Sequence, residues 1–170
     1  SDSLLQDHAE RPLSAQSLEV CQKLLKQPPG ARATTQSLLD AVRSATPHVC
    51  WKQSYTEKDA GIDAFYLSNY GWFNLIAPSG PFVSDTLRLS VGYWEKGLFY
   101  PRHWHEPEEI YLTIAGSATF LSDGRDPIDA GAGATICHYS NQPHAADFSN
   151  APLLAAAFWR GRELEAKPIL

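Results

Sequence analysis

The segment from Gly97 to Gly116, GLFYPRHWHEPEEIYLTIAG, restricts the fold of this chain more than any other part of the sequence. It places His103 and His105 two positions apart, ahead of Glu109. In an extended strand, side chains two positions apart point to the same face of a sheet, so the two imidazoles project together. The segment therefore predicts a strand that presents two histidines on one face.

A turn at the intervening proline leads into a second strand, which reads EIYLTIA. One face of that strand carries Glu109, Tyr111 and Thr113, and the other carries isoleucine and leucine. Imidazole and carboxylate ligands without a thiolate suit a divalent transition metal, Fe(II), Zn, Mn, Ni or Co, and do not choose among them. We therefore expect His103, His105 and Glu109 to bind a metal. The alternative is a surface pair or a hydrogen-bonded polar group of the core.

The spacing G-x5-H-x-H-x3-E-x6-G resembles the first motif of the cupin superfamily. This resemblance implies a mainly β fold, the cupin double-stranded β-helix or jelly-roll barrel, with an N-terminal helical extension. Short strands separated by turn residues agree with a barrel of this kind. We expect one structural domain, with residues 1–59 forming the helical extension and residues 60–170 forming the barrel.

Composition narrows the range of partners. A chain of 170 residues with 44% apolar and 19% charged residues is typical of a globular domain. The formal net charge of −5 disfavours nucleic acid or an anionic membrane as the main partner. No apolar run approaches ~18 residues, and the N-terminus lacks the pattern of a secretory signal. Three cysteines without a CxxC motif indicate reduced thiols, and we expect a cytoplasmic protein.

Two helices are expected before the barrel. Ser14 or Ser17 is predicted to cap the first, which ends at the Pro-Pro-Gly at 28–30 and buries Leu18, Cys21, Leu24 and Leu25. Thr34 or Thr35 is predicted to start the second, which ends at Pro47 and turns Leu38, Leu39 and Val42 inward. We expect both to pack against the sheet; covering the open side of the barrel or forming a homodimer contact are the alternatives. Neither has the basic face of a DNA-reading helix.

The remainder of the chain reads as short strands. We place them near 62–67, 72–77, 85–94, 98–104, 108–115, 117–122, 134–138 and 153–159. Turns are expected at 78–80, 122–124 and 129–131, where proline, glycine, serine and aspartate gather.

A second motif, GAGATICHYSNQPHA at 131–145, resembles the second motif of the cupins. Gly131 and Gly133 suit a tight turn, and an Asn-x-Pro corner precedes His144. The resemblance makes His144 the third imidazole ligand. His138 is expected to lie in the substrate site beside the ligands and to support or pack against them, with ligation as the alternative.

The ordered set Y-x2-H-x-H-x3-E-x-Y, followed by H-x2-N-x-P-H-A and F-W-R-G, resembles the cupin-type dimethylsulfoniopropionate lyases over roughly residues 70–162. Such an enzyme eliminates dimethyl sulfide from a small zwitterionic sulfonium substrate and leaves acrylate. The resemblance implies that the substrate carboxylate sits on the metal and that Tyr111 is the general base. A free tyrosine has a pKa near 10, which an adjacent cation lowers. Tyr100 would orient the substrate or pass on a proton.

A sulfonium favours an aromatic wall, because cation–π contact tolerates dehydration. The candidates to line the site are Tyr66, Trp72, Trp94, Trp104 and Trp159, although aromatic residues on strands are more often core. Three other functions use the same fold. They are an Fe(II) cupin dioxygenase of a small thiol or related substrate, a sugar isomerase or epimerase, and a non-catalytic small-molecule-binding cupin. The modest number of basic residues near the motifs disfavours a sugar phosphate.

Overall fold

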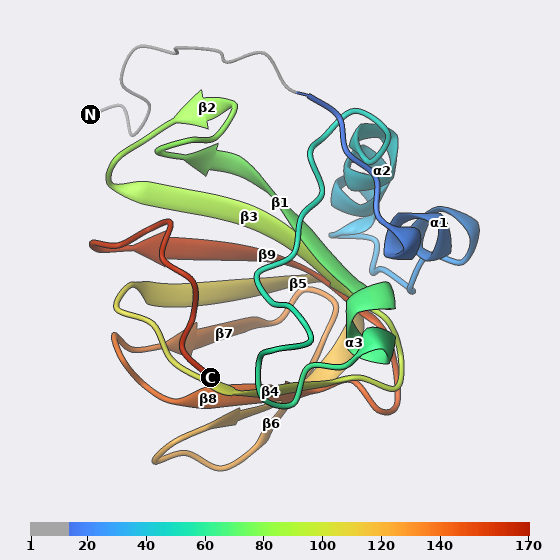
Figure 1. The fold of residues 1–170 in the computed structure, drawn as a ribbon. Coiled ribbons are helices and arrows are strands. Elements are labelled where there is room, and N and C mark those ends of the chain that lie inside the picture. Colours follow the sequence, from blue (N-terminus) through green and yellow to red (C-terminus); the bar gives the residue numbers. More distant parts are fainter. Residues whose placement is uncertain (1–13) are drawn as a thin grey trace.

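The computed structural model describes residues 14–170, so the predicted absence of a signal sequence and the first 13 residues of the extension lie outside the described part. Strands close into a barrel, and helices lie on its outer side (Figure 1). The predicted mainly β fold with N-terminal helices is confirmed. Within the described residues, no helix is long and apolar enough to cross a membrane.

Within residues 14–170, three helices precede nine strands. The helices are α1 (Glu19–Lys26), α2 (Gln36–Ala45) and α3 (Ala64–Ser68). The strands are β1 (Tyr70–Ala77), β2 (Phe82–Val83), β3 (Leu87–Trp94), β4 (Phe99–His103), β5 (Glu108–Ser122), β6 (Ile128–Gly131), β7 (Thr135–His138), β8 (His144–Asp147) and β9 (Leu153–Arg160).

The long strand β5 belongs to both sheets of the barrel. Its first half pairs with β9 and β7, in a sheet that continues through β3, β1 and β2. Its second half pairs with β6 and β8, and β8 pairs with β4. The pairing register shifts between Thr113 and Ala115, next to Gly116, which has a φ of 79°. The two strands predicted at 108–115 and 117–122 are therefore one strand that changes sheets at this bend.

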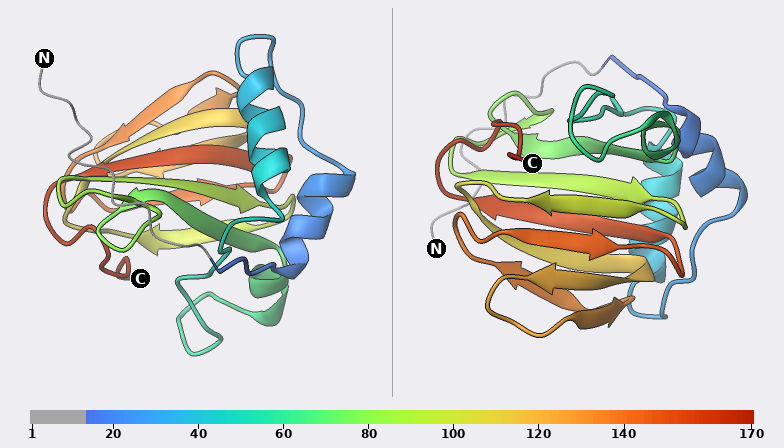
Figure 2. Two further views of the ribbon diagram at one scale, coloured as in Figure 1. Left: turned by 90° about the horizontal axis from the view of Figure 1, so that it is seen from above. Right: turned by 60° about the horizontal axis from the view of Figure 1, so that its bottom comes forward.

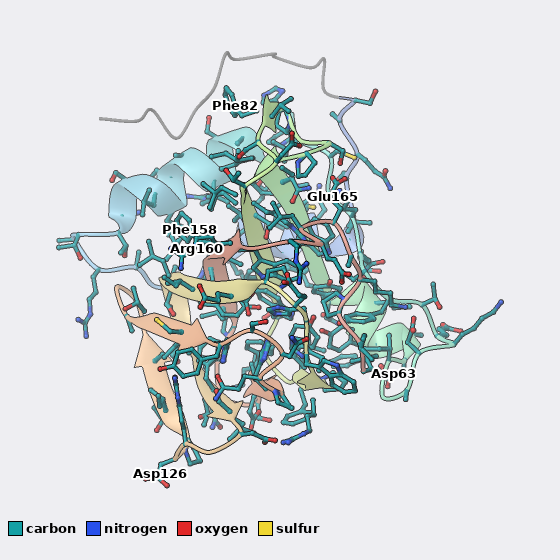
Figure 3. All side chains as sticks on the ribbon, turned by 90° about the vertical axis from the view of Figure 1, so that its left-hand side faces the viewer. Asp63, Phe82, Asp126, Phe158, Arg160 and Glu165 are labelled. Carbon is teal, nitrogen blue, oxygen red and sulfur yellow. The ribbon has the colours of Figure 1, made fainter. Side chains whose placement is uncertain are left out.

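The first sheet separates two apolar clusters. Its inner face, together with the second sheet, encloses Tyr70, Trp94, Tyr100, Tyr111 and Phe120. Its outer face packs against α1 and α2, on the outside of the barrel (Figure 2). Phe158, labelled in Figure 3, packs against this outer cluster. The helices thus cover the sheet, as predicted, and the interior of the barrel holds aromatic and polar residues.

The helix predictions need two corrections. Neither serine caps α1; its N-cap is Leu18, whose backbone N–H donates to the Sγ of Cys21. Thr35 is the N-cap of α2, as predicted, and the helix ends at Ala45 with Thr46 as its C-cap, directly before Pro47, also as predicted. Leu38 is 41% exposed, because only the Leu39 side of this turn faces the sheet.

Among the strands, the prediction at 62–67 is wrong. That segment forms α3, because the Asp63 carboxylate accepts a hydrogen bond from the Tyr66 N–H at 2.7 Å and caps the helix. The turn expected at 129–131 is also wrong, since Asp129 and Ala130 pair with Thr119 and Ala118 as part of β6. The sequence prediction omitted β2, β6 and β8, which have two or four residues each. Strands this short carry too few residues for alternation to be recognised.

Candidate active site

The pairing register aligns four inward-facing residues in one row across the first sheet. Arg88 on β3 pairs with Trp159 on β9, which pairs with Glu109 on β5, which pairs with His138 on β7. All four are buried, with exposed fractions of 7% or less. Directly paired residues on neighbouring strands bring their side chains into contact. The barrel interior thus contains a polar row that begins with a guanidinium and ends with an imidazole.

Three further imidazoles face this row from the second sheet. His103 ends β4 and pairs with His144 on β8, and their rings lie 4.1 Å apart. His105 follows β4, with its ring 5.0 Å from that of His144. Two positions apart, His103 and His105 are both buried, as the sequence predicted. One nitrogen from each of the three lies within 4.8 Å of the others, a spacing at which they could hold a metal ion.

The Nδ1 atoms of these three histidines all form hydrogen bonds with backbone carbonyls. His103 bonds to the carbonyl of Pro101 at 2.8 Å, His105 to Pro107 at 2.9 Å and His144 to Gln142 at 2.8 Å. A carbonyl only accepts, so each Nδ1 carries the proton. In the neutral ring the lone pair is then on Nε2, and this is how proteins orient histidine ligands of metals.

Two of these Nε2 atoms, those of His105 and His144, lie against Glu109. Its Oε2 lies 3.3 Å from the Nε2 atoms of both His105 and His144. The Nε2 of His144 is buried and has no hydrogen-bond partner among the described residues. Lone pairs of neutral imidazoles facing a carboxylate repel it unless a cation lies between them. We call His103, His105, Glu109 and His144 the candidate metal-binding set, and its donors fit a divalent transition metal.

The charge states favour this reading. Burial raises the pKa of Glu109, but the imidazoles of His105 and His144 donate to this carboxylate whenever their Nε2 atoms carry protons, and this effect outweighs burial, so the pKa of Glu109 lies well below the ordinary value. Burial and the neighbouring His144 lower the pKa of His103 to about 3. The carboxylate is therefore ionised and the His103 ring neutral near pH 7, which are the forms that bind metals.

His138 lies behind His144, with the rings stacked 3.9 Å apart. Its Nδ1 lies 3.1 Å from the Ser122 hydroxyl, and its Nε2 is buried without a partner among the described residues. Glu109, His138 and His144 form a second group that could hold an ion. His138 therefore contacts the set, as expected, and the alternative that it is a ligand stays open.

Both tyrosines named from the sequence reach this site. Tyr100 stacks on His103 at 3.9 Å, and its hydroxyl lies 2.8 Å from that of Tyr55. The Tyr111 ring lies 5.9 Å from that of His138. Burial and the neighbouring Glu109 raise the pKa of Tyr111 well above 10. Without a bound cation, Tyr111 therefore keeps its proton near pH 7.

A cavity opens beside the polar row, and we call it the substrate cavity. The chemically relevant part of its lining is Trp72, Arg88, Trp94, Tyr100, Glu109, Tyr111 and Trp159. Between these residues the cavity is lined by small residues, Ser90, Gly92 and Ala157, where larger side chains would fill the space. A Cβ on Gly92 would lie 2.4 Å from the Trp94 ring, so this glycine makes room for the indole.

Two of the predicted aromatic residues do not line this cavity. Tyr66 is buried behind it, with its ring 6.2 Å from that of Tyr100. Trp104 alternates with the inward-facing His103 and His105, and its backbone pairs with that of Ile169. The C-terminal segment that carries Ile169 lies along the barrel, where Glu165, labelled in Figure 3, accepts a hydrogen bond from the Ser79 backbone N–H at 3.0 Å.

Sequence reasoning missed several residues of the cavity wall, among them Arg88, Tyr70 and Ser54. Arg88 shares a strand face with the serine, glycine and tryptophan at positions 90, 92 and 94, so alternation along β3 could have found it. Tyr70 begins β1 and stacks on Trp94 at 5.8 Å. Ser54 precedes the barrel strands, in a segment whose sequence carries no periodic signal.

Comparison with known proteins identifies the family of this chain. A family model described as "Dimethlysulfonioproprionate lyase" matches residues 2–155. The dimethylsulfoniopropionate lyase DddQ of Ruegeria pomeroyi is 36% identical over 148 residues, which cover 86% of this chain and 72% of that protein. The crystal structure of DddQ from this organism superposes with a TM-score of 0.89 and 31% identity, over 99% of this chain and 84% of that one.

Two further structures place the fold. One, described as belonging to the DMSP lyases RdDddP and RnDddQII, has a TM-score of 0.89 and 38% identity, over 97% of this chain and 84% of that one. A cupin-like protein of Thermotoga maritima shares the fold alone, with a TM-score of 0.50 and 13% identity over 62% of this chain and 79% of that one. The predicted cupin barrel is therefore confirmed. The chain belongs to the dimethylsulfoniopropionate lyase family, and it is a carbon–sulfur lyase.

Proposed function

We propose that this enzyme cleaves dimethylsulfoniopropionate to dimethyl sulfide and acrylate, with a divalent metal bound by His103, His105, Glu109 and His144. Family membership supports the reaction. One observation carries the metal site: three imidazoles with protonated Nδ1 atoms lie within metal-binding distance of one another, and two of them direct their Nε2 atoms toward a buried, ionised carboxylate. When bound, the cation would supply positive charge that stabilises negative charge developing on the substrate carboxylate and favours the phenolate form of Tyr111.

Tyr111 is the proposed general base. As a phenolate it would remove a proton from the carbon alpha to the substrate carboxylate. The electron pair of that C–H bond forms the double bond of acrylate while the bond from the beta carbon to sulfur breaks. Dimethyl sulfide leaves as a neutral molecule with the electrons of that bond, and the proton stays on the Tyr111 oxygen. Tyr111 suits this role because it lines the substrate cavity two residues from Glu109.

Tyr100 is the proposed orienting residue. Its ring lies against His103, and the Tyr55 hydroxyl is its hydrogen-bond partner. Burial raises its pKa well above 10, so it keeps its proton and can donate a hydrogen bond to the substrate. The apolar walls around it exclude water, which strengthens each polar contact inside the cavity.

The direct test is detection of dimethyl sulfide and acrylate from purified protein supplied with dimethylsulfoniopropionate. The protein would be stripped with a chelator and reloaded separately with Fe(II), Zn, Mn, Ni or Co, then assayed with and without oxygen. We expect equal amounts of both products in either atmosphere and none after chelation. Product formation that requires oxygen would indicate dioxygenase chemistry instead, and full activity after verified metal removal would refute metal dependence.

Replacing members of the candidate metal-binding set separates binding from chemistry. His105→Ala and Glu109→Ala should each lose bound metal and activity together. His48→Ala is the matched control, because this histidine is exposed and lies on the chain ahead of the barrel. A variant of the set that keeps a full metal complement would remove that residue from the ligands.

A further inference from the structure

A buried cation forms part of the substrate cavity, outside the candidate metal-binding set. The Arg88 guanidinium carbon lies 4.5 Å from the ring centroids of both Trp72 and Trp159. A buried charge is costly unless an opposite charge compensates it. No carboxylate within residues 14–170 forms a salt bridge with Arg88. Glu109 is two strands away in the same row, about 10 Å between backbones at the usual strand spacing.

The hydrogen bonds of Arg88 leave donors free. Its Nε donates to the Asn74 side-chain oxygen at 3.1 Å, and its Nη1 donates to the Leu164 carbonyl at 3.0 Å. Both acceptors are neutral. The Nη2 atom has no acceptor among the described residues, although the guanidinium carries five N–H groups. The side chain is thus held in place at one edge, while no carboxylate of residues 14–170 lies within salt-bridge distance of its charge.

The Arg88 guanidinium also makes the rings of Trp72 and Trp159 less favourable for binding a cationic ligand. Lys52 lies 4.5 Å from the Trp72 ring, in addition to Arg88. Trp159 contacts Arg88 and also stacks on His105 at 4.1 Å. A sulfonium placed on either indole would meet a protein cation. At the other end of the cavity, no Lys or Arg of the described chain lies over the rings of Trp94, Tyr70, Tyr100 or Tyr111.

We propose that Arg88 contacts the carboxylate of the substrate and thereby determines which way round the zwitterion lies; this rests on the proposed function. The substrate carboxylate lies along the polar row, between Arg88 and Glu109. There the Arg88 guanidinium can donate charge-assisted hydrogen bonds to it. The sulfonium lies toward the stacked rings of Trp94 and Tyr70. The small side chains of Ser90 and Ala157 leave room for the substrate between these two ends.

The test compares Arg88→Met and Arg88→Lys with wild-type enzyme, all metal-loaded and checked for metal content and thermal unfolding. Arg88→Met should raise KM for dimethylsulfoniopropionate at least tenfold and lower kcat less. Arg88→Lys, which keeps the charge without the planar fork, should raise KM by a smaller factor. Lys52→Met is the matched control, because it removes the other cation on Trp72 and should leave KM unchanged. Unchanged KM in a folded Arg88→Met variant would overturn the proposal.

Ligand binding distinguishes failure of this inference from failure of the proposed function. Calorimetry would use acrylate, which has the carboxylate, and trimethylsulfonium, which has only the cation. Arg88→Met should weaken acrylate binding at least tenfold and leave trimethylsulfonium binding equal or stronger. This result would support the Arg88 contact even if the wild-type enzyme released no dimethyl sulfide. Equal acrylate affinity in both proteins would overturn it.

A measurement on the wild-type protein covers the case in which Arg88→Met does not fold. A buried guanidinium with restrained rotation gives nitrogen NMR signals distinct from those of exposed arginines. The Nη signals of Arg88 should shift when acrylate is added to the metal-loaded enzyme and stay in place with acrylamide. Signals that ignore acrylate at saturation would refute the contact.

Discussion

The indole Nε1 of Trp159 donates a hydrogen bond to Oε1 of Glu109 across 2.6 Å, from the neighbouring strand of the same sheet. Because Oε1 is held in this way, Oε2 is the oxygen that lies 3.3 Å from His105 and His144. The same indole stacks on the His105 ring at 4.1 Å. One side chain therefore orients two members of the candidate metal-binding set.

Trp159→Phe tests this support. Phenylalanine keeps an aromatic face for His105 but removes the N–H that binds Glu109. Loss of such an outer contact typically weakens metal binding by about 10- to 100-fold. Competition against a chelator of known affinity would measure the change. Trp104→Phe is the control, since Trp104 does not line the substrate cavity, and equal losses in the two variants would contradict a specific role for the Trp159 N–H.

Tyr111→Phe should separate chemistry from metal binding. We expect metal content to match wild type and kcat to fall by at least about 10²-fold, the size of a lost general base. In the wild-type enzyme kcat/KM should rise with pH, because Tyr111 acts only after losing its proton, and burial and Glu109 raise its pKa while the bound cation lowers it. Stopped assays at a series of pH values from about 6 to 10 would measure this rise of kcat/KM with pH. Tyr139→Phe, at an exposed position, is the control, and near-normal turnover in Tyr111→Phe would eliminate this base.

Gly116→Ala should destabilise the fold strongly. A Cβ at this glycine would lie 1.8 Å from the Pro152 carbonyl oxygen, and its φ of 79° also disfavours a side chain. Gly124 has nearly the same φ, 76°, but open space around its Cβ position. We expect Gly124→Ala to cost about 1 kcal/mol of unfolding free energy and Gly116→Ala at least about 3 kcal/mol. Urea unfolding of both variants measures the difference, and equal costs would show that the clash relaxes freely.

The metal-free protein should lose stability as the pH falls below about 6.5. Burial and the neighbouring His144 lower the pKa of His138 to about 3, whereas an unfolded histidine titrates near 6.5. Between these values the unfolded chain binds a proton that the native state does not, so the unfolding free energy decreases as pH decreases. From pH 6.5 to 5 this costs roughly 1.5 kcal/mol for this residue. Urea unfolding of His138→Asn should show a shallower slope, and an unchanged slope would contradict the shift.

Local patterns were sufficient where one strand or one turn carries the information. Alternation along β5 correctly placed Glu109, Tyr111 and Thr113 on the buried face. The H-x-H spacing did the same for His103 and His105, since a strand has a period of two residues. The Asn-x-Pro corner also behaves as predicted. Asn141 adopts a φ of 56°, and its N–H bonds to the His105 carbonyl at 2.8 Å, next to the start of β8 at His144.

Local patterns failed where a competing interaction decided the outcome. An apolar run after Asp63 reads as a strand, but the aspartate side chain caps a backbone N–H and starts a helix. Leu38 and Leu39 are adjacent apolar residues, and only contact with the sheet decides that the second is the buried one. Trp104 was expected to line the site, but it alternates with two inward-facing histidines, so its side chain points away from the cavity.

The sequence by itself determined the residue types of the site, their faces on each strand and the barrel family, because these depend on spacings within a few residues. Only the tertiary structure decided that Arg88, Trp159, Glu109 and His138 lie in one row. That row comes from the register between strands far apart in the chain, which no local period encodes. Because of this register, Trp72 and Trp159, which were expected to face a sulfonium, contact the buried Arg88 guanidinium instead.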